Sequence, residues 1–191
     1  MDWNGYEPYD PGVFGPPRKQ TRAAAKAAFE KLMRSRVERK AALAKLLAAN
    51  GIDLDASDAG IQQLDEWFRA SVEHDPNAEP GQLKPMWYSV VNDVALFLGD
   101  VIIERAPNLE WKFFTFGKRD LAYQRHVIMG FPVANLKYNI DVDLNVAIHA
   151  HRIVAVSVDG RFPRTRHHAP SNERFERDRL YLGAGDCRLT Q

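Results

Sequence analysis

The sequence predicts an α+β domain in which long helices precede and follow a small antiparallel hairpin. Three observations indicate this: an almost wholly apolar helical stretch that stops at a proline, two segments rich in β-favouring residues directly after it, and an alanine-rich helical pattern near the N-terminus. The 191 residues suit one domain with extensions, large enough to form a core without disulfides or metals. We expect an extended or disordered tail at 1–17, a basic helix at 18–51, a single α+β body at 52–158 and a flexible tail at 159–191.

The element that organises the body is a helix expected over 85–105. Pro85 suits its first turn, where a missing N–H costs nothing, and Pro107 prevents continuation. Its apolar side chains recur over most of its circumference, and the polar residues form a thin solvated edge. This edge comprises Ser89, Asp93, Asp100 and Glu104. Gly99 lies within the helix despite its low propensity, which indicates close approach of another backbone, although a half-exposed site with no special role also accommodates a glycine.

Two strands, expected at 109–116 and 123–131, return on each other through a turn at 117–120. Together with the preceding helix they supply the residues that we expect to carry stability. These are Trp87, Val94, Leu98, Trp111, Phe113 and Val127.

A motif extends from the end of the 85–105 helix to the second strand. It consists of a Leu-Gly pair in the last turns of the helix, a proline before an alternating Leu and Trp, and a strand that ends in Gly-Phe. It comprises Leu98, Gly99, Ile102, Pro107, Leu109, Trp111, Val127, Gly130 and Phe131. In it the chain resembles small uncharacterised bacterial α+β proteins built from a helix, a hairpin and a following helix. The resemblance covers only part of the chain and implies a fold, but no activity.

Four further segments complete the prediction. A helix is expected over 21–49, closed by Asn50-Gly51, and a second begins at Ser57 or Asp58. The stretch 140–158 alternates like a strand, but it also has helical spacing behind Asp141 or Asp143, and we favour a helix over 142–156. A short helix near 172–182 is also expected.

Charge is strongly segregated although the net charge is only +1. Between residues 18 and 49, ten Lys and Arg face two acids, whereas 50–110 holds twelve acids against three Lys and Arg. Such asymmetry indicates either that the basic helix contacts a nucleic acid or other partner, or that it folds back on the acidic body. If it meets a partner, part of this long helix projects and uses residues on its apolar and basic edges. The candidate partner-binding residues are Phe29, Met33, Val37, Arg34, Arg36, Arg39 and Lys40.

Sites for chemistry are scarce. The sequence has no nucleophile elbow, no phosphate-binding glycine loop and no paired cysteines, and its one cysteine is Cys187. His149 and His151 are candidate metal ligands, but they would point together only on a strand, and on a helix they would diverge by about 200°. We therefore expect no cofactor and no catalytic site, and an enzyme is the less supported class.

The remaining class is a binding protein. We expect a cytoplasmic protein-interaction domain with an unidentified protein partner, with non-specific nucleic-acid binding through the basic helix as the alternative and metal-dependent activity at His149 and His151 as a weaker one. No apolar run reaches membrane-spanning length without acidic residues, so no membrane partner is expected. The aromatic residues of 1–17 leave open a second possibility for that tail, namely that it docks on the body or on a partner.

Overall fold

A computed structural model describes residues 1–13, 15–79 and 81–159. It confirms the α+β prediction. The elements in chain order are a 3₁₀ turn η1 (Pro17–Lys19), α1 (Arg22–Ala49), α2 (Asp58–Ser71), α3 (Pro85–Arg105), β1 (Glu110–Phe113), β2 (His126–Met129) and α4 (Val142–Asp159). The predicted short helix near 172–182, the C-terminal tail and Cys187 lie outside the described residues.

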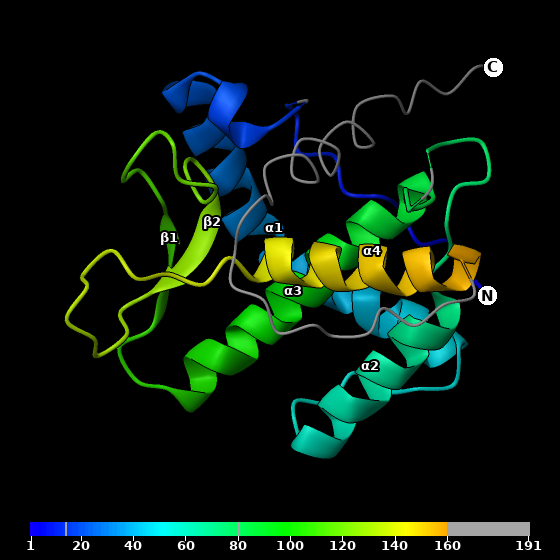
Figure 1. The fold of residues 1–191 in the computed structure, drawn as a ribbon. Helices are drawn as coiled ribbons and strands as arrows, with labels where there is room; N and C mark the ends of the chain where they lie inside the picture. Colours follow the sequence, from blue (N-terminus) through cyan, green and yellow to red (C-terminus); the bar gives the residue numbers. More distant parts are fainter. Residues whose placement is uncertain (14, 80, 160–191) are drawn as a thin grey trace.

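Helix α3 is the centre of the fold. It packs against α1 on one side and α4 on the other, and α2 closes the base of the molecule through contacts with α4 (Figure 1). Trp87, Val90 and Leu96 are completely buried, as the width of the apolar pattern predicts. Among the described helices, α3 is long and apolar enough to cross a membrane, but 61% of its most apolar window is buried inside the protein, as in the core helix of a globular domain.

The polar edge of α3 is solvated only at its C-terminal end, where Glu104 is exposed and Asp100 partly so, and this corrects the sequence prediction for Ser89 and Asp93. Asp93 is 0% exposed and Ser89 is 8% exposed, because α1 and the N-terminal segment lie over this edge. Asp93 forms an ion pair with Arg39 of α1, and Asp100 forms ion pairs with Lys40 and Arg36. The basic helix therefore folds back on the acidic body, which is the second of the two explanations for the charge segregation.

Helix α1 also belongs to the hydrophobic core. Leu43, Leu46 and Leu47 are at most 1% exposed and join the same cluster as the buried residues of α3. The core is thus not confined to 52–158. Thr21 caps the N-terminus of the helix, because its side chain accepts a hydrogen bond from the Ala24 N–H. Asn50 caps the C-terminus, and Gly51 follows at φ +81°, as predicted for this terminus.

The N-terminal segment has little regular structure but is not a loose tail, and here too the sequence prediction is corrected. Tyr6 is buried, Trp3 stacks edge-on against Trp87, and the Tyr9 N–H donates to Ser89 Oγ at 2.9 Å. The aromatic residues therefore dock on the body, which was the alternative left open for this segment. Ser89 and Asp93 of α3 supply its polar contacts, and these contacts hold a segment rich in prolines and glycines in one conformation against the body.

The hairpin is antiparallel as predicted, with Trp111 opposite Ile128 and Phe113 opposite His126. The strands are shorter and the connection longer than expected, because regular pairing stops at Phe113 and the loop spans 114–125. Main-chain bonds from Gln124 to Phe114 and from Phe114 to Arg125 shape its base. Phe114 is 1% exposed, whereas Phe113 is only partly buried against Phe29. Phe114 is therefore more deeply buried than Phe113, the residue that the sequence analysis places in the core.

Gly99 shows why a glycine stands in the middle of α3. A Cβ atom there would lie 2.0 Å from Cζ2 of Trp111, so the indole ring occupies the space of a side chain. The close neighbour that the sequence indicated is present, but it is a side chain and not a backbone. The Trp111 Nε1–H donates to Asp100 Oδ1 at 2.9 Å, which fixes the ring against the helix.

Helix α4 resolves the choice between strand and helix at 140–158 in favour of the helix. Asp141 caps it, because its carboxylate accepts the Leu144 N–H at 3.0 Å. The same carboxylate pairs with the buried Arg125 of the hairpin loop, and Arg125 Nη2 also reaches Asp143 at 2.7 Å. The hairpin and the start of α4 are therefore joined by one buried ionic cluster.

Candidate functional site

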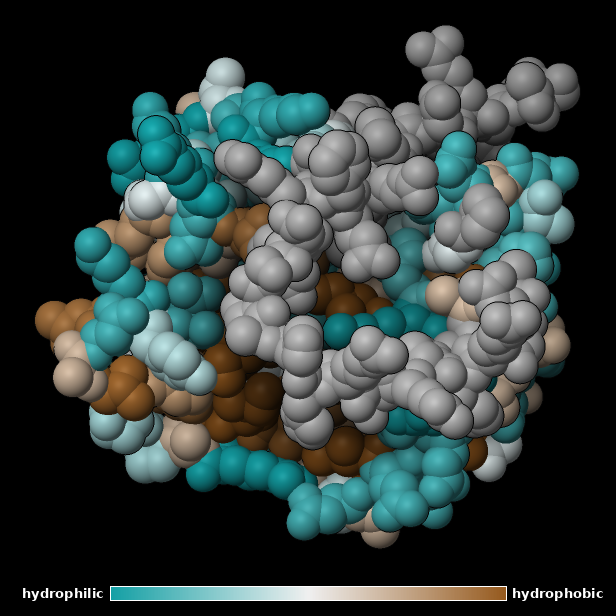
Figure 2. Space-filling view, in the orientation of Figure 1, coloured by the Kyte–Doolittle hydropathy of each residue, from teal (hydrophilic) through white to brown (hydrophobic). Residues whose placement is uncertain are grey.

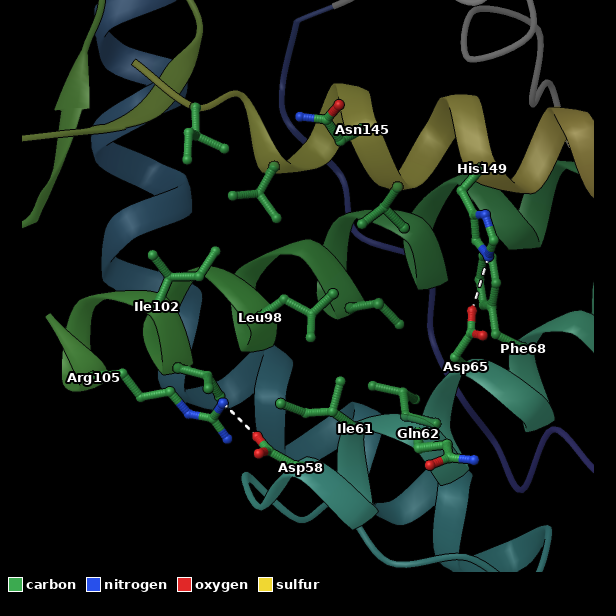
Figure 3. A pocket seen from close by; sticks show the side chains of 16 residues that line it. Asp58, Ile61, Gln62, Asp65, Phe68, Leu98, Ile102, Arg105, Asn145 and His149 are labelled. Carbon is green, nitrogen blue, oxygen red and sulfur yellow. Dashed lines mark hydrogen bonds and ion pairs between the residues drawn. The ribbon is translucent and has the colours of Figure 1, made fainter. Parts of the chain in front are cut away.

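A groove lies between α2, α3 and α4. Its volume is about 800 Å³, and Figure 3 shows side chains from the three helices converging on it. In Figure 2, apolar atoms gather in the corresponding region between the lower half of α3 and α2. The apolar lining comprises Ile61, Leu64 and Phe68 from α2, Val94, Leu98, Val101 and Ile102 from α3, Ile140 before α4, and Val142 and Val146 from α4.

An ion pair and a histidine–carboxylate hydrogen bond mark the rim. At one end Arg105 Nη1 lies 2.6 Å from Asp58 Oδ1, and at the other the His149 ring donates through Nε2 to Asp65 Oδ1 at 2.9 Å (Figure 3). The His149 ring also stacks on Phe68, with ring centroids 6.2 Å apart. The two ends of the groove are therefore polar, and the wall between them is apolar.

Asp65 is held in its ionised form. Partial burial alone would raise the pKa of Asp65, but hydrogen bonds from Arg69 and His149, together with their charges, outweigh it and leave this pKa below its ordinary value. Arg69 Nε donates to Asp65 at 2.7 Å from one helical turn further along α2. The carboxylate thus has partners on both sides and orients the histidine at the groove edge.

The groove combines an apolar wall with a polar rim. Its wall offers apolar surface, and its rim offers two carboxylates, a guanidinium, an imidazole and the amides of Gln62 and Asn145. Its lining holds no serine, cysteine, threonine or lysine, and its two carboxylates and its imidazole are engaged in contacts with Arg105, Arg69 and each other. In the part of the chain that the structure describes, no group of three or more His, Cys, Asp or Glu is placed to hold a metal ion.

The candidate metal ligands are not brought together. On α4 the two histidines diverge as expected for a helix: His149 pairs with Asp65, and His151 donates through Nδ1 to the carbonyl of Gly81. Each imidazole is used to tie α4 to a different segment. The histidines therefore stabilise the packing of α4, and one of them also lies in the groove.

The candidate partner-binding residues of α1 are divided by the fold. Arg39 is buried, and Lys40 and Arg36 are engaged by Asp100. Phe29 packs on Phe113, and Met33 contacts the core. Only Arg34 and Val37 of the set are exposed, with Val37 at 73%. Nucleic-acid binding through α1 stays a prediction, but three of the four candidate cations, Arg36, Arg39 and Lys40, have acidic partners within the chain.

A buried polar network lies beneath α1. The Arg39 guanidinium donates to Asp93 at 3.0 Å through Nε and at 2.6 Å through Nη2, and the Tyr6 hydroxyl donates to the same carboxylate. Arg39 also donates to the Glu7 carbonyl at 3.0 Å. Burial, reinforced by the charge of Asp93, raises the pKa of Tyr6 far above its ordinary value. For Arg39, burial opposes the charged form, but the hydrogen bond and charge of Asp93 outweigh it and raise its pKa.

A second enclosed group is His126 on β2, whose side chain is partly buried and whose Nε2 atom is shielded from solvent. Burial lowers its pKa, an effect that the neighbouring charge of Arg125 reinforces and the charges of Asp143 and Asp141 oppose. Its Nε2 atom is enclosed by Trp111 and the hairpin. The network of Arg39, Asp93 and Tyr6 joins elements that are distant in sequence. Neither this network nor His126 lines the groove, so we assign both to stability.

The groove was missed at the sequence level, although its residues were noticed. The spacing of Ile61, Leu64 and Phe68 predicts one apolar face of a helix, and that of Leu98 and Ile102 predicts a helix covered on most sides, so both sets are expected in the core. The one indication in the sequence is that the apolar face of α2 is flanked by acidic residues such as Asp58 and Asp65. Nothing in the periodicity shows that three apolar faces meet without filling the space between them.

No protein-family model matches this chain, and comparisons with curated proteins and with solved structures found no match either.

Proposed function

We propose that this protein is a binding module without a catalytic site and that its groove between α2, α3 and α4 receives the apolar edge of an amphipathic helix from a protein partner. The observation that carries the proposal is the groove itself, which has about 800 Å³ of open volume and ten apolar lining residues contributed by α2, α3, the segment before α4, and α4. Six of these side chains are buried and form the floor of the groove, whereas Ile61, Leu98, Ile102 and Ile140 are partly exposed, so a ligand in the groove would contact apolar side chains of all three helical layers.

The shape of the groove favours a helix over a small molecule. Small-molecule sites usually enclose 70–90% or more of their ligand, whereas this groove is only partly enclosed. An amphipathic helix needs only a trough for side chains at positions i, i+3 or i+4, and i+7, while its outer face stays in water. The apolar wall between the Asp58–Arg105 and Asp65–His149 pairs provides such a trough.

The charges beside the groove indicate the chemistry of the partner. The exposed side of α2 carries Asp58, Asp65 and Glu66 against Arg69. Opposite charges across an interface steer association and fix orientation. We therefore expect Lys or Arg on the flank of the partner helix that faces α2.

The test is a selection of helical peptides from a displayed library against the full chain, followed by affinity measurements on a groove-filling variant. Gln62 is an exposed residue of the groove lining, so Gln62→Trp should fill the trough without entering the core. The matched control is Glu38→Trp, which places the same ring on an exposed position of α1. Selected peptides should lose at least about tenfold in affinity with Gln62→Trp, equivalent to about 1.4 kcal/mol, and be unaffected by Glu38→Trp.

Equal affinities for the two variants would contradict the proposal. A groove that takes up an apolar dye such as 1-anilinonaphthalene-8-sulfonate, with loss of uptake in Gln62→Trp, but that selects no peptide would show instead that its ligand is a small molecule.

A further inference from the structure

A second surface lies on the two loops around the hairpin. We call it the loop patch, and define it as Phe116, Val133, Leu136, Lys137 and Tyr138. Large apolar side chains that are exposed in the described residues are Met1, Val37, Phe116, Val133, Leu136 and Tyr138. Four of these six belong to the loop patch, whereas Met1 and Val37 stand elsewhere. Singly exposed apolar residues are ordinary, but a concentration of them is not.

The loop patch is held in place by its own contacts. Lys137 Nζ lies 5.7 Å from the centroid of the Phe116 ring and so joins the two loops, and Tyr138 packs edge-on against Phe131 with centroids 5.2 Å apart. The Tyr138 N–H donates to the Asn135 carbonyl at 2.9 Å, which closes a turn with Leu136 near its tip. Leu136 is 88% exposed, so the fold presents this side chain to its surroundings.

Positive charge surrounds these apolar side chains. Lys118 and Arg119 are exposed in the loop that carries Phe116, and Lys137 is exposed within the patch, against one nearby exposed acid, Asp120. Lysine is depleted in the cores of protein–protein interfaces. In contrast, Lys and Arg beside Leu, Phe and Tyr suit the headgroup region of an anionic bilayer, where aromatic rings and aliphatic side chains enter the interface and the cations remain with the phosphates.

We propose that the loop patch is a peripheral contact site for an anionic phospholipid membrane. The two loops that carry the patch lie at the end of the molecule that holds β1 and β2, away from α2 (Figure 1). A protein bound to a membrane through these loops would therefore keep α2 on the side that faces solvent. The contact needs no membrane-spanning segment and is therefore compatible with a core helix α3, although it departs from the sequence expectation that no membrane is a partner.

The test is co-sedimentation of the full chain with vesicles of phosphatidylcholine alone and of phosphatidylcholine with 30% phosphatidylglycerol. The informative variant is Leu136→Glu and the matched control is Val37→Glu, an exposed apolar residue of α1 outside the patch. Both sites are exposed, and an unchanged urea midpoint would verify that both variants fold. We expect binding to the anionic vesicles, at least a tenfold weaker partition for Leu136→Glu, no change for Val37→Glu, and little binding to the neutral vesicles.

Absence of binding to anionic vesicles, equal binding to both vesicle types, or equal loss in the two variants would overturn the proposal. A concentration-dependent dimer that Leu136→Glu dissociates, in a protein that does not sediment with vesicles, would also overturn it and assign the patch to a second copy of this chain.

Discussion

Removal of the Asp93 carboxylate should be among the most damaging single changes in this protein. Asp93 is 0% exposed and accepts hydrogen bonds from Arg39 Nε at 3.0 Å, Arg39 Nη2 at 2.6 Å and the Tyr6 hydroxyl. In Asp93→Ala the guanidinium of Arg39, which is 8% exposed, would keep only the Glu7 carbonyl and the Tyr6 hydroxyl as partners. Loss of one member of a buried ion pair typically costs about 3–5 kcal/mol, because the other charge stays buried without compensation.

The measurement is urea unfolding followed by tryptophan fluorescence, since Trp87 lies in the core and contacts Trp3 of the N-terminal segment. A second variant, Asp93→Ala combined with Arg39→Met, removes both charges and should recover part of the lost free energy of unfolding. If Asp93→Ala costs less than about 1 kcal/mol, or if the double variant is as unstable as the sum of the single variants, the pair is not a coupled buried unit and the reasoning fails.

Further outcomes follow from the same structure, and each is measured by urea unfolding. Because the pKa of Tyr6 is raised above about 10, the unfolded chain loses its phenolic proton first and stability falls as pH rises above about 10; Tyr6→Phe should flatten this slope by up to about 1.4 kcal/mol per pH unit. Because burial lowers the pKa of His126, the unfolded chain binds more protons below about pH 6.5 and stability is lost as pH falls; His126→Gln should weaken that loss, and an unchanged acid limb would contradict a buried neutral ring. Gly99→Ala should cost about 1–3 kcal/mol by overpacking against an indole ring, and a gain in stability would show that the ring moves aside freely. Phe114→Ala should cost about 3–5 kcal/mol and Phe113→Ala clearly less, and the reverse order would contradict the burial described for β1 and its loop.

The elements themselves could be predicted because they depend on local patterns. The apolar width of α3, the prolines near its ends and the cap at Asp141 are all readable within a few residues. The antiparallel hairpin follows from two β-rich segments joined by a turn sequence, but its loop length does not. Gln124 shows why: its side chain donates to the carbonyls of Pro17 and Gln20, more than one hundred positions away, and this contact gives no local signal.

The polar edge of α3 is the clearest failure of local reasoning. Asp93 has the spacing of a solvated residue, and its burial depends on Arg39, 54 positions earlier, and Tyr6, 87 positions earlier. Charge segregation along the chain contained this information only as an alternative, because opposite charges in two segments are equally compatible with an external partner. The groove could not be predicted for a related reason: a stripe on α2 and a covered α3 specify apolar surfaces, but not whether a third helix fills the space between them.

The most direct test of the central claim is a heteronuclear NMR titration of the full chain with a selected helical peptide. If the groove binds the peptide, we expect chemical-shift changes in the methyl groups of Ile61, Leu98 and Ile102 and none at the exposed residues Arg34 and Val37 of α1. These changes should be lost in Gln62→Trp. Shift changes confined to α1, or changes at the groove that persist in Gln62→Trp, would contradict the central claim.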